Sequence, residues 1–138
     1  MQWNGERYGG FSETEPWLPV SAGFRNEITV EAQQKDQDSI LSFYKKLIAM
    51  RKMYPVIAEG EISFLETGTD RVLAYRRKLG EQQIAVFCNL DGEKHTVKVD
   101  GAWRGDPVLL ENYEARQMDP EGETYTMEPY EFMVLGRA

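Results

Sequence analysis

The clearest alternation of apolar and polar positions lies in residues 38–53. Apolar side chains recur there at the i, i+4, i+7, i+8 spacing of one helical face. Asp36 or Asp38 is placed to cap the first free amides and to put negative charge at the positive end of the helix dipole. Tyr54-Pro55 ends the helix, since proline disfavours a helical conformation in the residue before it. The pattern predicts one amphipathic helix, with an apolar face of Ile40, Leu41, Phe43, Tyr44, Leu47 and Ile48.

After Pro55 the pattern changes to short runs of strand-forming residues separated by turn residues. Residues 84–88 are apolar at every position, which predicts a central strand covered on both faces. Short strands at roughly ten-residue spacing indicate an antiparallel β-sandwich or barrel. The predicted strands are residues 61–66, 72–76, 84–88, 95–99, 107–110, 123–127 and 130–135.

Residues 1–35 show no helical or strand period. A stretch this long without regular structure is usually a functional loop or a disordered segment. Disordered segments are poor in aromatic residues, whereas this one contains Trp3, Tyr8, Phe11, Trp17 and Phe24. We therefore interpret it as loop sequence of a larger protein that continues upstream.

Composition excludes several classes of protein. The chain has 138 residues, the size of one domain with a real core. No apolar run approaches the ~20 residues that span a bilayer, so we expect no membrane partner. The net charge of −7 argues against a nucleic-acid partner. The one basic cluster, Arg76-Arg77-Lys78, is predicted to be a solvated strand end, because adjacent strand residues point to opposite faces.

Few side chains suggest chemistry of their own. Cys88 is the only cysteine, which excludes an internal disulfide and favours the cytoplasm. It lies in the most apolar run of the chain, so we predict a buried, inert thiol. His95 is the only histidine and has no neighbours at metal-ligand spacing, so we predict a strand-surface residue, no metal site and no cofactor. Closely spaced carboxylates are assigned to solvated or capping roles. These pairs are Glu13/Glu15, Asp36/Asp38, Glu59/Glu61 and Glu121/Glu123.

Two roles are possible for the three tryptophans. The indole rings of Trp3, Trp17 and Trp103 are able to stack on sugar rings, which would make a carbohydrate-binding platform. Tryptophans in loops are also common packing residues. For Trp3 and Trp17 we favour packing.

Six short motifs stand out in order along the chain. They are Met1-Gln2-Trp3, Pro16-Trp17-Leu18-Pro19-Val20, Ile28 to Gln33, Asp38 to Ile48, Val86 to Leu90, and Glu128-Pro129-Tyr130-Glu131. Together they resemble the carboxy-terminal third of the α-amylase superfamily, glycoside hydrolase family 13. The resemblance is to the α-glucosidase branch, which includes oligo-1,6-glucosidases, dextran glucosidases and trehalose-6-phosphate hydrolases. It covers nearly the whole chain.

The resemblance implies a parent enzyme with a (β/α)₈ barrel. Residues 1–54 would be the loop after the last barrel strand and the final barrel helix, and residues 55–138 a Greek-key-like C-terminal β-sandwich. The fold class is then mostly β, preceded by one amphipathic helix. The family's reaction is retaining hydrolysis of α-glucosidic bonds by an aspartate nucleophile and a glutamate acid/base. These carboxylates lie in preceding strands of the family, so no catalytic residue is assigned here. Gln2 and Trp3 are the residues expected near substrate.

Three hypotheses follow. In the first, the chain is the non-catalytic terminal portion of a retaining α-glucosidase and supports the barrel, so that its partners are the rest of that barrel and, through the parent, an oligosaccharide. In the second, it is a stand-alone carbohydrate-binding β-sandwich module. In the third, it is a protein-interaction domain whose exposed helix self-associates. We favour the first and expect no glucosidase activity from the isolated chain, because a glycosyl-enzyme intermediate needs the missing nucleophile.

Overall fold

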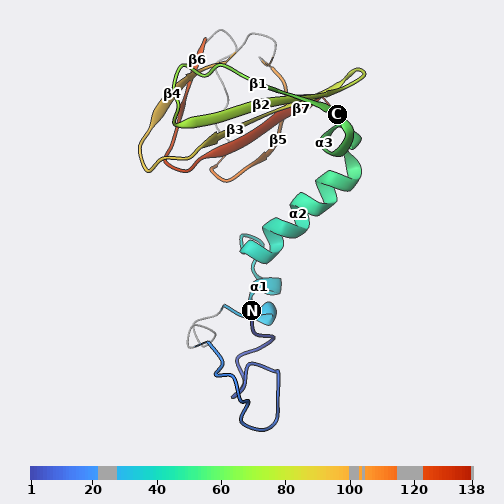
Figure 1. The fold of residues 1–138 in the computed structure, drawn as a ribbon, viewed down its shortest axis with the longest axis vertical. Helices are drawn as coiled ribbons and strands as arrows, with labels where there is room; N and C mark the ends of the chain where they lie inside the picture. Colours follow the sequence, from blue (N-terminus) through green and yellow to red (C-terminus); the bar gives the residue numbers. More distant parts are fainter. Residues whose placement is uncertain (22–27, 100–102, 104, 115–122, 138) are drawn as a thin grey trace. The chain divides into compact units, whose positions relative to one another are not determined.

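A computed structural model describes residues 1–21, 28–99, 103, 105–114 and 123–137. The chain divides into two compact units, residues 1–53 and residues 54–138 (Figure 1). The first unit contains helices α1 (Val30–Lys35) and α2 (Ile40–Met53), and the second contains helix α3 (Pro55–Glu59) and the strands.

Helix α2 occupies the predicted segment and ends before Tyr54-Pro55, as expected. Its cap differs from the prediction. The hydroxyl of Ser39 accepts the Ser42 amide at 3.2 Å, and the side chain of Gln33 accepts the Leu41 amide at 3.1 Å. Asp36 instead ends α1, and its carboxylate accepts the amide of Asp38 at 2.9 Å. The assignment of the cap to Asp36 or Asp38 was therefore wrong.

Two short helices were not predicted from the sequence. Helix α1 lies within residues 1–35, here called the leader, which were predicted to lack regular structure. Helix α3 lies where strands were expected to begin directly after Pro55. They have six and five residues, too few for a 3.6-residue period to repeat. Their local signals are specific, since Thr29 caps α1 through its hydroxyl and Pro55 occupies the first turn of α3.

The second unit is an antiparallel β-sandwich, which confirms the predicted fold class and the seven strands among the described residues. One sheet has the order β1-β2-β3-β7-β5, and the other pairs β4 with β6. Strand β3 lies at the centre of the larger sheet, as its continuous apolar run indicated. The strands are β1 (Glu61–Phe64), β2 (Val72–Leu79), β3 (Gln82–Asn89), β4 (His95–Lys98), β5 (Val108–Glu111), β6 (Thr124–Met127) and β7 (Phe132–Arg137).

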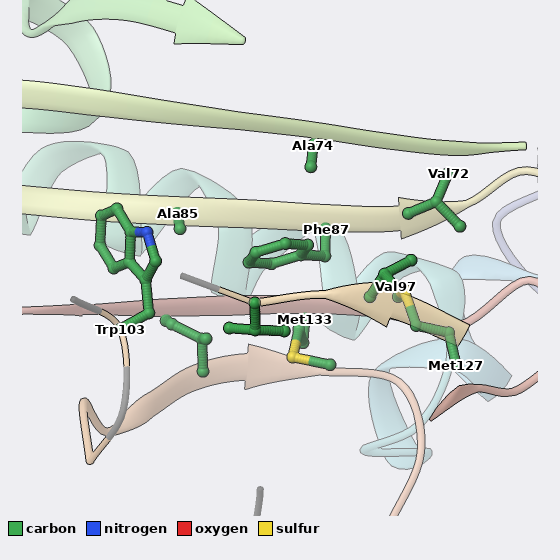
Figure 2. Packing of buried hydrophobic residues seen from close by; sticks show 10 residues of the cluster. Val72, Ala74, Ala85, Phe87, Val97, Trp103, Met127 and Met133 are labelled. Atoms are coloured by element: carbon green, nitrogen blue, oxygen red, sulfur yellow. The ribbon is translucent and has the colours of Figure 1, made fainter. Parts of the chain in front are cut away.

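The core lies between the two sheets (Figure 2). Phe87 of β3 faces Val97 of β4 and Met127 of β6, and all three side chains are almost fully buried. Trp103 joins this core with 2% of its surface exposed. A sugar-stacking platform on Trp103 is therefore wrong, because the indole ring is covered by protein.

Candidate functional site

The leader folds back on itself, and its first residues are hydrogen-bonded to the start of helix α1. Gln2 and Thr29 form an isolated parallel β-bridge. The carbonyl of Gln2 accepts the amide of Val30 at 2.8 Å, and the carbonyl of Trp3 accepts the amide of Glu31 at 2.9 Å. The first amides of a helix have no partner within the helix, so here the main chain of Gln2 and Trp3 satisfies two of them. The two residues expected near substrate are thus held in place through their backbone.

Two glycines let the chain fold back over these residues. Gly9 and Gly10 have φ angles of 63° and 74°, in the left-handed region that favours glycine. The amide of Trp3 donates to the carbonyl of Gly9 at 2.8 Å. A Cβ atom on Gly9 would lie 2.6 Å from Cγ of Gln2. The Gly9-Gly10 pair therefore fixes the loop around Gln2 and does not form a phosphate-binding loop.

The loop borders two hollows within the first unit. One, of about 260 Å³, is lined by Gln2, Phe11 and Leu18 among others. The other, of about 370 Å³, is lined by Arg7, Glu15 and Trp17 among others. Gln2 borders the first hollow, whereas Trp3 borders neither of these two.

The side chains around the second hollow combine an aromatic surface with charge. Trp17 is 90% exposed, and the Arg7 guanidinium lies over the Tyr8 ring at 5.1 Å from its centroid, a cation–π contact. The packing that we favour for Trp17 belongs to the edge loop of a parent barrel, and it stays a prediction. The exposed ring remains a candidate stacking surface.

Helix α2 presents an exposed apolar surface. None of its residues is buried, although its sequence has a broad apolar face. Ile40 is 70% exposed, Tyr44 60% and Ile48 53%. A helix with such a face is normally stabilised by burying it.

The remaining sequence candidates have structural roles. His95 is half-buried, and its Nε2 atom lies 3.2 Å from Oδ2 of Asp91. This contact lowers the pKa of the Asp91 carboxyl. Cys88 is half-buried, and burial raises the pKa of its thiol, as expected for an inert cysteine.

The basic cluster and the carboxylate pairs show no catalytic arrangement among the residues that the structure describes. Arg77 donates to the carbonyl of Gly60 at 2.8 Å, while Arg76 and Lys78 lie on the opposite face of the strand and are exposed. Glu13 and Glu15 are exposed. Of the pair Glu121/Glu123, Glu121 lies outside the described residues. Within the described part of the chain, no group of three His, Cys, Asp or Glu side chains is placed to hold a metal ion. No described helix is long and apolar enough to cross a membrane.

Comparison with known proteins decides the family. A family model described as maltogenic amylase, C-terminal domain, matches residues 62–134, and one described as alpha amylase, catalytic domain, matches residues 1–60. The chain belongs to the α-amylase family of glycoside hydrolases. The expectation from its six motifs is confirmed.

Individual members of the α-amylase family align along almost the whole chain. Trehalose-6-phosphate hydrolase of Bacillus subtilis is 34% identical over 97% of the chain and 24% of its own length. Oligo-1,6-glucosidase of Bacillus cereus is 30% identical over 98% of the chain and 24% of its own length. The structure of Bacillus licheniformis trehalose-6-phosphate hydrolase superposes with a TM-score of 0.82 at 28% identity, over 98% of the chain and 24% of that structure. The chain thus spans about a quarter of the length of the curated relatives it matches.

Proposed function

We propose that this chain is the non-catalytic terminal portion of a retaining α-glucosidase that acts on α-glucosidic oligosaccharides. Residues 1–54 would complete the catalytic barrel, and residues 55–138 would form the C-terminal domain that supports it. The main partner is then the rest of the barrel. Gln2 and Trp3 would lie beside the substrate, and we propose a cytoplasmic location from the lone Cys88.

The exposed apolar face of α2 is the observation that carries this proposal. Burying one side chain of the size of Ile48 stabilises a protein by about 1.5–3 kcal/mol. A helix of 14 residues is marginal in water by itself. The outer helices of a (β/α)₈ barrel bury one apolar face against the strands, which is the environment that α2 lacks in its own unit.

A hybrid enzyme tests the proposal. The quarter of Bacillus subtilis trehalose-6-phosphate hydrolase that aligns with this chain is replaced by the 138 residues. We expect the hybrid to fold and to hydrolyse trehalose 6-phosphate. Ile48→Asp should strongly reduce the yield of soluble, active hybrid, because the charge would enter a buried contact.

Ala49→Asp is the matched control. Ala49 is exposed and lies about 140° from Tyr44 around the helix, away from the apolar face. Equal losses in the two variants, or an inactive and unfolded hybrid, would contradict the proposal. The isolated chain should not hydrolyse p-nitrophenyl α-glucoside, and turnover above a matched blank would contradict its non-catalytic role.

A carbohydrate-binding module is the second candidate. The nearly free indole of Trp17 beside the hollow of about 370 Å³ favours it. Isothermal titration of the isolated chain with maltooligosaccharides and isomaltooligosaccharides separates the two candidates. Micromolar affinity that is lost in Trp17→Ala would support the module.

A further inference from the structure

The loop around Gln2 and Trp3 contains an asparagine that is followed directly by a glycine, Asn4-Gly5. Each of the other asparagines of the chain is followed by a larger residue. A glycine has no side chain to hinder the approach to its amide nitrogen, and its backbone angles are the least restricted. Asn4 is therefore the asparagine whose side chain the next backbone nitrogen reaches most easily.

The structure turns the side chain of Asn4 towards that nitrogen. The Oδ1 atom of Asn4 accepts the amide of Glu6 at 3.1 Å, which forms an Asx turn. Such a turn closes a ring through Cγ of the asparagine and the following peptide group, so Cγ of Asn4 lies beside the amide nitrogen of Gly5. Among the described residues, the Gly5 amide makes no backbone hydrogen bond, and Nδ2 of Asn4 has no acceptor. No hydrogen bond within this part of the chain therefore holds the two groups apart.

The surroundings of Gly5 leave room for a reaction with water. Gly5 is exposed, and a Cβ atom on it would meet no heavy atom within 4 Å, its chain neighbours left aside. Water therefore has access to the peptide group between Asn4 and Gly5.

We propose that Asn4 is a site of spontaneous deamidation and that its isoaspartyl product loosens the loop around Gln2. The Gly5 nitrogen loses its proton and bonds to Cγ of Asn4. The bond between Cγ and Nδ2 breaks, ammonia leaves with that proton, and a cyclic imide remains. Water then opens the imide at either carbonyl: opening at Cγ gives aspartate, and opening at the main-chain carbonyl gives isoaspartate. Water is the only co-reactant, and nothing is oxidised or reduced.

The isoaspartyl product lengthens the main chain inside a closed turn, because its main chain runs through Cγ. The amide of Trp3 donates to the carbonyl of Gly9 at 2.8 Å, and Asn4 lies between these two residues in the chain. Gly10 packs on the Asn4 side chain, since a Cβ atom on Gly10 would lie 3.0 Å from Oδ1 of Asn4. The additional main-chain carbon atom therefore changes the span that the hydrogen bond between Trp3 and Gly9 has to close.

Asn89 provides an internal control for the reaction. Its Oδ1 atom accepts the amide of Asp91 at 3.0 Å, so it forms the same kind of turn. However, it is followed by Leu90, it is only 3% exposed, and its Nδ2 atom donates to two main-chain carbonyls, both at 2.7 Å. We expect Asn4 to deamidate at least about tenfold faster than Asn89, because a buried, hydrogen-bonded amide reacts only when its surroundings open.

Peptide mass spectrometry of the isolated chain during incubation at neutral pH measures both rates, because replacement of an amide by a carboxyl group changes the mass of the peptide. Gly5→Leu should slow the reaction of Asn4 at least about tenfold, since the side chain hinders the approach to the nitrogen. The position accepts a side chain, because the space around Gly5 is open and its φ angle is not in the left-handed region.

Glu6→Leu is the matched control. It places the same side chain one residue later and leaves Asn4-Gly5 intact, so the rate of deamidation should not change. Circular dichroism melting checks that both variants fold.

Hydrogen exchange measures the effect on the loop. The deamidated chain carries one more negative charge and is separated by anion exchange, and exchange of the Trp3 amide is followed by NMR. We expect this amide to exchange at least about fivefold faster in the isoaspartyl form than in the unmodified chain. Asn4→Asp is the control, because it adds the same charge without lengthening the main chain; it should leave the exchange rate unchanged.

The inference goes beyond the proposed function and does not depend on it. Equal deamidation of Asn4 and Asn89, or equal rates in Gly5→Leu and the wild type, would overturn the assigned site. Equal exchange of the Trp3 amide in the unmodified and isoaspartyl forms would overturn the loosening of the loop. Folding and activity of the hybrid enzyme test the proposed function separately.

Discussion

The ion pair between Asp106 and Arg137 should stabilise the β-sandwich more than an ordinary surface pair. The Arg137 Nε atom donates to Oδ1 of Asp106, whose side chain is fully buried, while the side chain of Arg137 is 64% exposed. Among the described residues, the second carboxylate oxygen of Asp106 has no hydrogen-bond partner. Loss of Arg137 would therefore leave a buried carboxylate without compensation.

The expected magnitude lies between two limits. Removing one partner of a fully buried pair costs about 3–5 kcal/mol, whereas an exposed pair contributes about 0–1 kcal/mol. Since one partner here is buried and the other is largely exposed, Arg137→Met should destabilise the unit by roughly 1.5–3 kcal/mol. Asp106→Asn should cost about 1 kcal/mol. The double variant should be destabilised by about 1–2 kcal/mol less than the sum of the single variants.

Urea unfolding of the four proteins measures these free energies. The fluorescence of Trp103, which is buried in the core, reports the transition, and equal m-values show that the comparison is valid. Arg76→Met is the control, because Arg76 is exposed and, among the described residues, bonds only to Ser63 at 3.3 Å. It should cost less than about 0.5 kcal/mol. If the two single effects add to within about 0.5 kcal/mol, the carboxylate does not depend on Arg137 and the reasoning is refuted.

Three further predictions concern the same unit. The contact with His95 lowers the pKa of the Asp91 carboxyl below its ordinary 3.8. The stabilisation by this contact is therefore present above pH 3.8 and is lost as the pH falls through the folded-state pKa. In urea titrations between about pH 5 and pH 2, Asp91→Asn should lose less stability than the wild type, and parallel curves of stability against pH would contradict this. Tyr130 has a φ of 54°, so Tyr130→Gly should be about 1 kcal/mol more stable than Tyr130→Ala in thermal melts, and equal melting temperatures would argue against backbone strain. A Cβ on Gly136 would lie 2.6 Å from the Gln83 carbonyl oxygen and 2.8 Å from a methyl carbon of Ile84. Gly136→Ala should therefore destabilise the protein by about 1–3 kcal/mol. An unchanged urea midpoint would show that β3 and β7 move apart without cost.

Elements long enough to repeat their period were predictable from the sequence. The apolar spacing of α2 and the uninterrupted apolar run of β3 are patterns within a single element, so recognising them needs no knowledge of distant residues. The ordered motifs likewise located the family. Helices α1 and α3 were missed because one or two turns contain no full repeat, and the Ser39 cap was missed because several polar residues near Asp36 qualify on sequence alone.

For the candidate site, the sequence singled out Gln2 and Trp3, and their contact with substrate stays a prediction. The structure added that their carbonyls cap α1 and that Gly9 packs on Gln2. The two carbonyl contacts have no sequence signal, because a backbone carbonyl is the same in every residue. The contact of Gly9 with Gln2 depends on how the loop folds back, which the sequence did not predict.

The sequence by itself determined the order and type of the long elements and the family, because these follow from local periodicity and from residue identity. Only the tertiary structure decided that Trp103 enters the core while Trp17 remains in solvent, and that Phe64 and Leu73 lie on the uncovered face of the sheet. The physical reason is that a period of two assigns side chains to two faces of a strand, but which face becomes the core depends on where the second sheet packs.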